Sequence, residues 1–292
     1  MIDLHVHSTM SDGLKTPAEI FNEAQKLKLN MLSITDHNSV DAYKEIDFSK
    51  IYDGRVILGC ELTCMLDKLC IELLAYGYDL KKLDSFIKEI YLPFPKMNVL
   101  ETNLVIDKLS KTMLIIDKNS IEFDAENEYG NRGVHREIVR HKENKKYIDE
   151  LAWNDPHEFS LRYLSEESSP FYVDYSPLIP SYLEVVDAIK KSDGLIFIPH
   201  IYKYRNSLDL IENKILKTGL VDGIECYHSS FSANDIKNSM KIASSYNLFM
   251  SGGTDTHGYE GDDEVKLGVG YGSMCIPDSI VEPWVQKLIR RK

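Results

Sequence analysis

Five of the nine histidines in this chain of 292 residues lie in four short segments, each of which comes soon after a short apolar run. The segments are His5–His7, Thr35–His37, Pro199–His200 and Asp255–His257. Side chains alternate along a strand, so His5 and His7 are expected to point to the same side. Imidazoles and carboxylates gathered at the strand ends of one barrel are ligands for transition metals, and they predict a multinuclear metal site.

The charge of the chain limits the kind of partner it can bind. A net charge of −12 disfavours binding to long nucleic acid, which needs many lysines and arginines to neutralise phosphates. A small phosphorylated substrate is still compatible with this charge, because bound divalent cations reverse the local potential.

Composition indicates an ordinary globular protein, with 43% apolar and 27% charged residues. No apolar run approaches the roughly 18 residues of a membrane span, and no signal peptide is recognisable at the N-terminus. The five cysteines are scattered and lack the spacing of a thiolate zinc site. We therefore expect a cytoplasmic protein with reduced thiols and no membrane association.

Strand and helix patterns alternate in two parts of the sequence. Strands are predicted over residues 31–35, 56–60, 70–76, 195–198 and 223–227, and a further strand ends at Asp255. Helices are predicted over residues 16–27, 39–50, 103–111, 134–142, 182–191, 207–217, 234–245 and 279–290. Repeated strand and helix units favour a parallel barrel with its site at the carboxyl ends of the strands.

The alternation is interrupted between residues 94 and 172, where polar, charged and aromatic residues dominate. We interpret this stretch as an inserted, mostly helical lobe. The predicted organisation is a first barrel part over 1–93, the lobe over 94–172 and a second barrel part over 173–292.

Four motifs together resemble those of the PHP (polymerase and histidinol phosphatase) family. They are Asp3–Ser8, Ser11–Gly13, Thr35–His37 and Ser251–His257. The resemblance covers roughly residues 1–90 and 173–292, and it implies an α/β fold, a distorted (β/α)7 barrel that holds two or three divalent ions of manganese, iron or zinc.

The inserted lobe makes the chain similar to a subgroup of small metal-dependent phosphoesterases. Some members of that subgroup remove the 3′-phosphate from nucleoside 3′,5′-bisphosphates or trim short oligonucleotides. The resemblance therefore implies an enzyme that hydrolyses a small phosphomonoester of a nucleotide by means of water activated by a metal.

The resemblance also implies ligands for up to three metals. The ligands of the first metal would be His5, His7, Glu61 and Asp255. Glu61 would bridge to a second metal, whose other ligands would be His200 and Glu72. The ligands of the third metal would be Asp12, His37 and His257.

Glu72 departs from the family pattern, because members of the family have a histidine at this place. A carboxylate is a harder ligand than an imidazole, so Glu72 would favour manganese or iron over zinc. An exposed carboxylate of a strand, without a metal, is the alternative interpretation of Glu72.

Substrate contacts are implied for three residues of the lobe. His135 matches a phosphate-binding histidine of the subgroup, and either Arg132 or Arg136 would supply the arginine, which is displaced by one residue here. A histidine on a helix surface is the alternative for His135.

Two further residues are implied to take part in catalysis. His228 would contact the substrate and protonate the leaving oxygen, and its alternative is an ordinary histidine of a loop. Asp36 would mainly orient neighbouring ligands.

Three other functions remain open from the sequence. Histidinol-phosphate phosphatase is the nearest alternative, and the inserted lobe disfavours it. Amidohydrolase chemistry on a C–N bond is a second alternative, because related barrels use similar metal sites. A catalytically weak PHP module that binds metal is the third.

Overall fold

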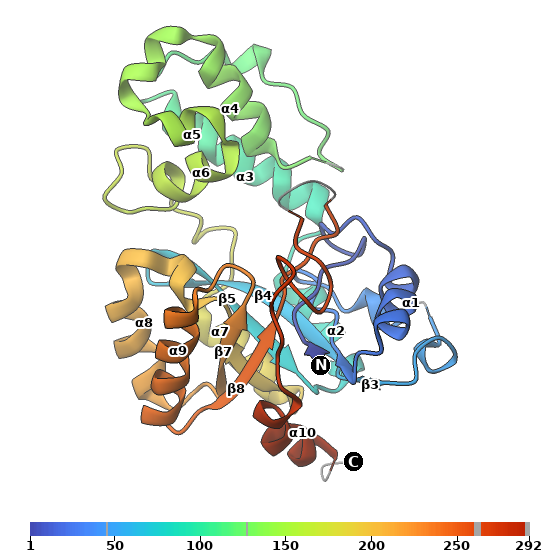
Figure 1. Cartoon of the computed structure of the whole chain (residues 1–292). Helices are drawn as coiled ribbons and strands as arrows, with labels where there is room; N and C mark the ends of the chain where they lie inside the picture. The colour runs from blue at the N-terminus through green and yellow to red at the C-terminus, as the bar shows by residue number, and fades with distance from the viewer. Residues whose placement is uncertain (45, 127, 260–263, 290–292) are drawn as a thin grey trace. The chain divides into compact units, whose positions relative to one another are not determined.

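The computed structural model describes residues 1–44, 46–126, 128–259 and 264–289, although not the side chains of Arg205, Asn206 and Ile289 (Figure 1). This chain divides into two compact units. The first unit comprises Met1–Thr63, Glu72–Ile87 and Leu183–Lys292. The second comprises Cys64–Ile71 and Lys88–Tyr182, so it includes a short segment before residue 94 that the sequence pattern does not separate from the barrel parts.

Three short parallel strands form the first sheet, in the order β1, β2, β3. Their bounds are Ile2–Asp3, Met31–Leu32 and Arg55–Val56. Ile2 lies opposite Met31, and Leu32 lies opposite Val56. This register brings the segments that follow β1 and β2 to the same edge of the sheet.

Five strands form the second sheet, in the order β4 to β8. Their bounds are Gly59–Leu66, Leu69–Tyr76, Leu195–Ile198, Gly223–His228 and Phe249–Gly253. β6, β7 and β8 are parallel, but β5 is antiparallel to β6, so the prediction of uniformly parallel strands is wrong at β5. Only Asp67 and Lys68 separate β4 from β5, and a two-residue connection is too short for a parallel crossover.

Single bridges connect extensions of the first sheet to the two edge strands of the second sheet, or to their extensions. Val6 bridges to Thr256, and His37 bridges to Glu61, both in parallel orientation. These bridges place the segment of His5 and His7 beside that of Asp255, and they place His37 beside Glu61.

A bulge in β7 changes which way its side chains point. The register with β8 shifts between Glu225 and Tyr227. Residues three apart in a regular strand face opposite sides, whereas the extra residue of a bulge resets the alternation. Glu225 and His228 therefore both reach the predicted site, where they contact His5 and Asp255.

The α-helices described outside residues 94–172 follow the predicted pattern, except the helix over residues 80–90, which was not predicted. They are α1 (Pro17–Leu27), α2 (Leu80–Ile90), α7 (Tyr182–Lys191), α8 (Leu208–Lys214), α9 (Ala233–Ser245) and α10 (Glu282–Ile289). Thr16 and Glu19 form the expected capping box of α1. The predicted end of the last helix, Arg290, lies outside the described residues. None of the helices described by the structure is both long and apolar enough to cross a membrane.

The helix predicted over residues 39–50 is wrong. Two 3-10 turns, Asp41–Tyr43 and Phe48–Lys50, occupy the described part of this stretch. The hydroxyl of buried Tyr43 donates to the Ile34 carbonyl at 2.6 Å and accepts from the Gly59 amide at 3.0 Å. These tertiary hydrogen bonds satisfy backbone groups at the ends of strands, and they outweigh the weak helical preference of the segment.

The part of the second unit over 94–172 is mostly helical, and no strand occurs among its described residues. Its main helices are α3 (Phe94–Leu109), α4 (Gly130–Arg140), α5 (Glu150–Asn154) and α6 (Pro156–Phe159). Val105, Val134, Ile138 and Phe159 are buried in one apolar core, which explains why α3 and α4 pack together.

Candidate metal centre

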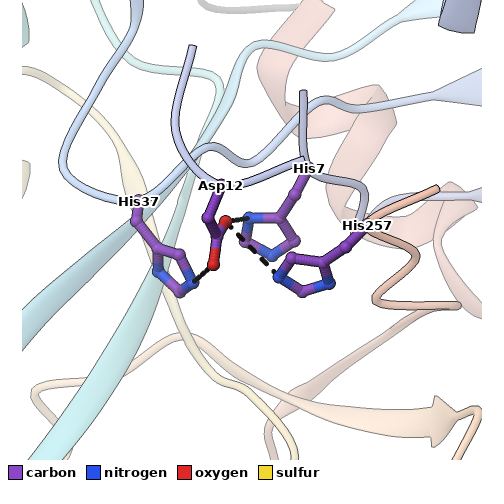
Figure 2. Close-up of side chains that lie close together, drawn as sticks. All are labelled: His7, Asp12, His37 and His257. Atoms are coloured by element: carbon purple, nitrogen blue, oxygen red, sulfur yellow. Dashed lines mark ion pairs between the residues drawn. The ribbon is translucent and has the colours of Figure 1, made fainter. Parts of the chain in front are cut away.

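Nine side chains are predicted to bind metal. Eight of them fall into three overlapping groups, and within each group the candidate ligand atoms lie at most 4.8 Å apart. The inner group is His5, His7, Glu61 and Asp255. The outer group is His7, Asp12, His37 and His257, shown in Figure 2. The Glu72 group is His37, Glu61 and Glu72. Each pair of groups shares one residue, as expected when neighbouring metals share ligands.

The inner group is the most buried of the three. Glu61 Oε2 lies 3.1 Å from His5 Nε2 and 3.2 Å from His7 Nε2. Asp255 Oδ1 lies 3.1 Å from His7 Nε2 and 3.4 Å from His5 Nε2. Donor atoms that surround one ion at bond lengths of about 2.1 Å are themselves separated by about 3 Å, so these spacings suit a metal.

Unsatisfied nitrogens test whether the residues fit a metal. Both ring nitrogens of His7 and Nδ1 of His200 are buried and make no well-oriented hydrogen bond in the described part of the chain, although His7 Nε2 lies 3.1 Å from Asp255 Oδ1 and 3.2 Å from Glu61 Oε2. An imidazole nitrogen buried without a partner is costly, and a bound cation would satisfy it. The donor set therefore fits divalent transition metals.

Ionised carboxylates dominate the electrostatics of the site. Burial alone would raise the pKa of Glu61. The nearby His5 and His37 lower it by more than burial raises it, so the pKa lies well below its usual value. Burial also opposes the ionisation of Asp255, yet Lys203 and His5 hold its pKa well below the usual range. Both carboxylates are therefore available as anionic ligands at neutral pH.

The outer group is more accessible than the inner one. Asp12 Oδ1 lies 3.6 Å from His7 Nδ1 and 3.4 Å from His257 Nε2, and Asp12 Oδ2 lies 3.8 Å from His37 Nε2 (Figure 2). About a fifth of the Asp12, His37 and His257 side chains is exposed. An ion held here would be open to water and to a substrate.

Glu72 and His200 meet on the other side of Glu61. Glu72 Oε2 lies 3.3 Å from His200 Nε2, and Glu72 Oε1 lies 3.5 Å from His37 Nδ1. His200 Nε2 is also 3.0 Å from Glu61 Oε1. Glu72 therefore points into the cluster, and this placement favours a ligand over an exposed carboxylate of a strand.

Backbone conformation at two of these residues is unusual. His200 has φ 27° and Asp255 has φ 57°, in the left-handed region that residues other than glycine rarely occupy. Such strain persists where the surrounding structure imposes it, and it is common at functional sites.

Asp36 supports the turn that carries Asp12. Its carboxylate accepts hydrogen bonds from the Ser8 amide at 2.7 Å, the Ser8 hydroxyl at 2.6 Å and the Ser11 hydroxyl at 2.7 Å. Asp36 belongs to none of the three groups. This placement suits the orienting role expected of it.

Two buried carboxylates of the site were missed by the sequence analysis. Glu225 lies 3.0 Å from His5 Nδ1 and accepts from the His200 amide at 2.8 Å. Asp3 accepts from the Thr254 hydroxyl at 2.7 Å and so ties β1 to the segment of Asp255. A glutamate inside an apolar strand is the signal that could have found Glu225, because a buried carboxylate needs a partner.

Lys203 was also missed, and it lies beside His228. Lys203 Nζ is 2.6 Å from Asp255 Oδ2, and 44% of its side chain is exposed. His228 is buried, with Nε2 at 3.1 Å from the same Asp255 oxygen and Nδ1 at 2.8 Å from the Ser230 hydroxyl. A cation and an imidazole thus adjoin the inner group, where both could contact a phosphate.

The predicted phosphate-binding residues of the lobe belong to the second unit. His135 is 5% exposed, and its Nε2 lies 2.9 Å from the Ala152 carbonyl. It is therefore not the helix-surface histidine of the alternative interpretation. Arg136 pairs with Glu128 and donates to the Glu122 carbonyl at 2.8 Å, whereas Arg132 is exposed.

The fold and the clustered ligands define the class of the protein as a metal-dependent hydrolase. The model of a family described as PHP domain matches residues 3–187, which is more than half of the chain. The chain therefore belongs to the PHP domain family, and it is a metal-dependent phosphoesterase of that family.

Two relatives align over most of the chain. A 5′-3′ exoribonuclease of Haemophilus influenzae is 24% identical over 97% of both chains. A 3′,5′-nucleoside bisphosphate phosphatase of Chromobacterium violaceum is 25% identical over 88% of this chain and 87% of its own.

Solved structures share the fold. An amidohydrolase from Chromobacterium violaceum, with bound SO4 and no metal, has a TM-score of 0.69 at 22% identity. A protein from Bifidobacterium adolescentis, described as a metal-dependent phosphoesterase, has a TM-score of 0.66 at 22% identity. Each comparison covers 99% of this chain and 96% of the other.

Proposed function

We propose that this enzyme hydrolyses a phosphomonoester of a small nucleotide, such as a nucleoside 3′,5′-bisphosphate or the end of a short oligonucleotide. The observation that carries the proposal is the sharing of Glu61 between two adjoining ligand groups, with its Oε2 beside His5 and His7 and its Oε1 beside His200. Sharing of this kind suits two or three ions close together, the arrangement that phosphoryl transfer commonly uses. The activities named for the two relatives support the choice of a nucleotide.

The proposed scaffold is a distorted (β/α)7 barrel that carries residues 94–172 as an inserted lobe. The bridges from Val6 to Thr256 and from His37 to Glu61 support closure, because they link extensions of the first sheet to both sides of the second. Closure would explain why ligands from both ends of the chain converge.

In the proposed assignment, the inner group binds the first ion. Glu61, Glu72 and His200 bind the second, and Asp12, His37 and His257 bind the third. Divalent ions bound there would polarise the phosphate and lower the pKa of a water molecule. Asp36 and Glu225 keep their neighbours oriented for this purpose.

The phosphate would be held by cationic side chains. Lys203 is exposed beside Asp255 and can reach an oxygen of the phosphate. Within the lobe, His135 with either Arg132 or Arg136 is proposed to bind phosphate. His228 would protonate the leaving oxygen, and its bond to Ser230 fixes the orientation of the ring.

A panel of three substrates tests the proposed function. Phosphate release would be measured with added Mn²⁺ from adenosine 3′,5′-bisphosphate, histidinol phosphate and a dinucleotide. We expect the bisphosphate to be hydrolysed fastest. A preference for histidinol phosphate would support the alternative phosphatase instead, and metal binding without any hydrolysis would support a catalytically weak module.

Replacing Glu72 by histidine tests the expected metal preference. An imidazole is a better ligand for zinc than a carboxylate is, so Glu72→His should increase affinity for Zn²⁺ relative to Mn²⁺ by roughly ten-fold. The measurement is a direct titration of both ions into the metal-free protein. Glu89→His, on the exposed face of α2, is the matched control. An unchanged ratio of affinities in Glu72→His would show that Glu72 binds no metal.

A further inference from the structure

A ladder of parallel rings leads from the buried inner group to the surface. His257 is stacked on His7, with ring centroids 4.2 Å apart and planes inclined by 11°. Tyr259 continues the series, with its ring inclined by 11° to that of His257 at a centroid distance of 6.1 Å. His7 is buried, whereas half of Tyr259 is exposed. The outer end of the ladder is thus an aromatic ring open to solvent.

Short-range structure fixes Tyr259 beside the outer group. Gly258 has φ +76°, which allows the chain to turn directly after His257, and a Cβ there would come within 3.2 Å of the Lys15 side chain. The Tyr259 hydroxyl lies 3.5 Å from the Asp12 carbonyl. Because Tyr259 follows a ligand by only two residues, its ring cannot move far from the outer group without disturbing His257.

A second apolar side chain is exposed at the same place. Leu14 donates its amide to the His257 carbonyl at 2.8 Å, and 58% of the residue is exposed. The neighbourhood of His257 therefore presents an aromatic and an aliphatic side chain to water, next to acidic and imidazole ligands. A substrate with a phosphate and a flat apolar part would match both kinds of surface.

We propose that the exposed face of Tyr259 is a stacking platform for the base of the nucleotide substrate. This inference rests on the proposed function and specifies its substrate as one that carries a base. Stacking on an aromatic ring tolerates any base, since every base has a π face. Tyr259 is then a specificity-determining residue, and the ligand groups hold the phosphate while the ring holds the base.

A purely structural role of Tyr259 makes a different prediction. If the ring only kept His257 in place, its loss would weaken metal binding and would affect all phosphorylated ligands alike. A stacking role affects only ligands with a base. Adenosine 5′-monophosphate and ribose 5-phosphate form a suitable pair of probes, because they differ by the base alone.

The test measures binding of both probes to Mn²⁺-loaded protein by calorimetry. Tyr259→Ala should raise the Kd of adenosine 5′-monophosphate about ten-fold and leave that of ribose 5-phosphate unchanged, while Tyr259→Trp keeps tight binding. Metal content should be equal in all variants. Tyr271→Ala, which removes another exposed tyrosine of the first unit, should change neither Kd.

Several results would overturn the platform. They are an equal rise of both Kd values in Tyr259→Ala, a loss of metal in that variant, or wild-type protein that binds both probes with the same Kd. Its failure is distinguishable from failure of the proposed function. Rapid hydrolysis of the bisphosphate with no effect of Tyr259→Ala on either Kd rejects the platform alone, and a base-dependent effect without any hydrolysis rejects the activity alone.

Discussion

Phosphate release should be lost when His5 and His7 are both replaced by alanine. The two imidazoles contribute to the inner group, and His7 also contributes to the outer group, so the double variant removes ligands from two of the three groups. Losing the ions would remove several kcal/mol of transition-state stabilisation, and we expect turnover to fall by at least about a thousand-fold. The measurement is Mn²⁺-dependent phosphate release at saturating substrate.

The fold of this double variant should remain largely intact. Circular dichroism and a thermal melt compared with the metal-free wild type would check this. His157→Ala is the control, because His157 is exposed on α6 of the second unit. Undiminished turnover in the double variant would reject the metal hypothesis.

Glu61→Gln should cause the second largest fall in turnover. Glu61 is 1% exposed and belongs to both the inner group and the Glu72 group. Its oxygens lie 3.1 Å from His5, 3.2 Å from His7 and 3.0 Å from His200. A neutral amide of the same shape cannot replace a bridging carboxylate, so we expect loss of at least one ion per chain and a fall in turnover of about a hundred-fold or more.

Metal analysis of the purified protein, together with turnover, checks this prediction. Glu167→Gln is a suitable control, because Glu167 forms an exposed ion pair with Lys68 and belongs to no ligand group. Glu61→Gln protein that retained the metal content of the wild type would show that Glu61 is not a bridge.

The candidate ligands were implied by the resemblance to the PHP family, and only some of them also follow from local pattern. His37 and Asp255 lie at the ends of predicted strands, and alternation places His5 and His7 on the same side. Their convergence then follows from the two bridges between the sheets.

Among the site residues that depend on irregular backbone, Glu225 and Lys203 were missed, and His228 was implied by the resemblance alone. Glu225 and His228 face the same side only because β7 contains a bulge, and no alternation rule predicts it. Lys203 reaches Asp255 from a 3-10 turn, Ile201–Ser207, that follows the left-handed conformation of His200. Neither feature has a periodic signal in the sequence.

Errors in the predicted fold have a similar origin. The segment over 39–50 was predicted as a helix because its pattern is locally plausible, whereas hydrogen bonds of Tyr43 to distant backbone groups determine its structure. The reversed direction of β5 follows from the short connection at Asp67, which the alternation of strands and helices did not reveal.

Several ions, held by shared ligands, are proposed to act together in phosphoester hydrolysis. To test this, metal is removed with a chelator, Mn²⁺ is added stepwise, and bound ions per chain and phosphate release from adenosine 3′,5′-bisphosphate are measured in the same samples. We expect no hydrolysis without metal, and activity that appears as the second ion binds. Hydrolysis by the metal-free chain, or full activity with one ion per chain, would rule out a mechanism with several ions.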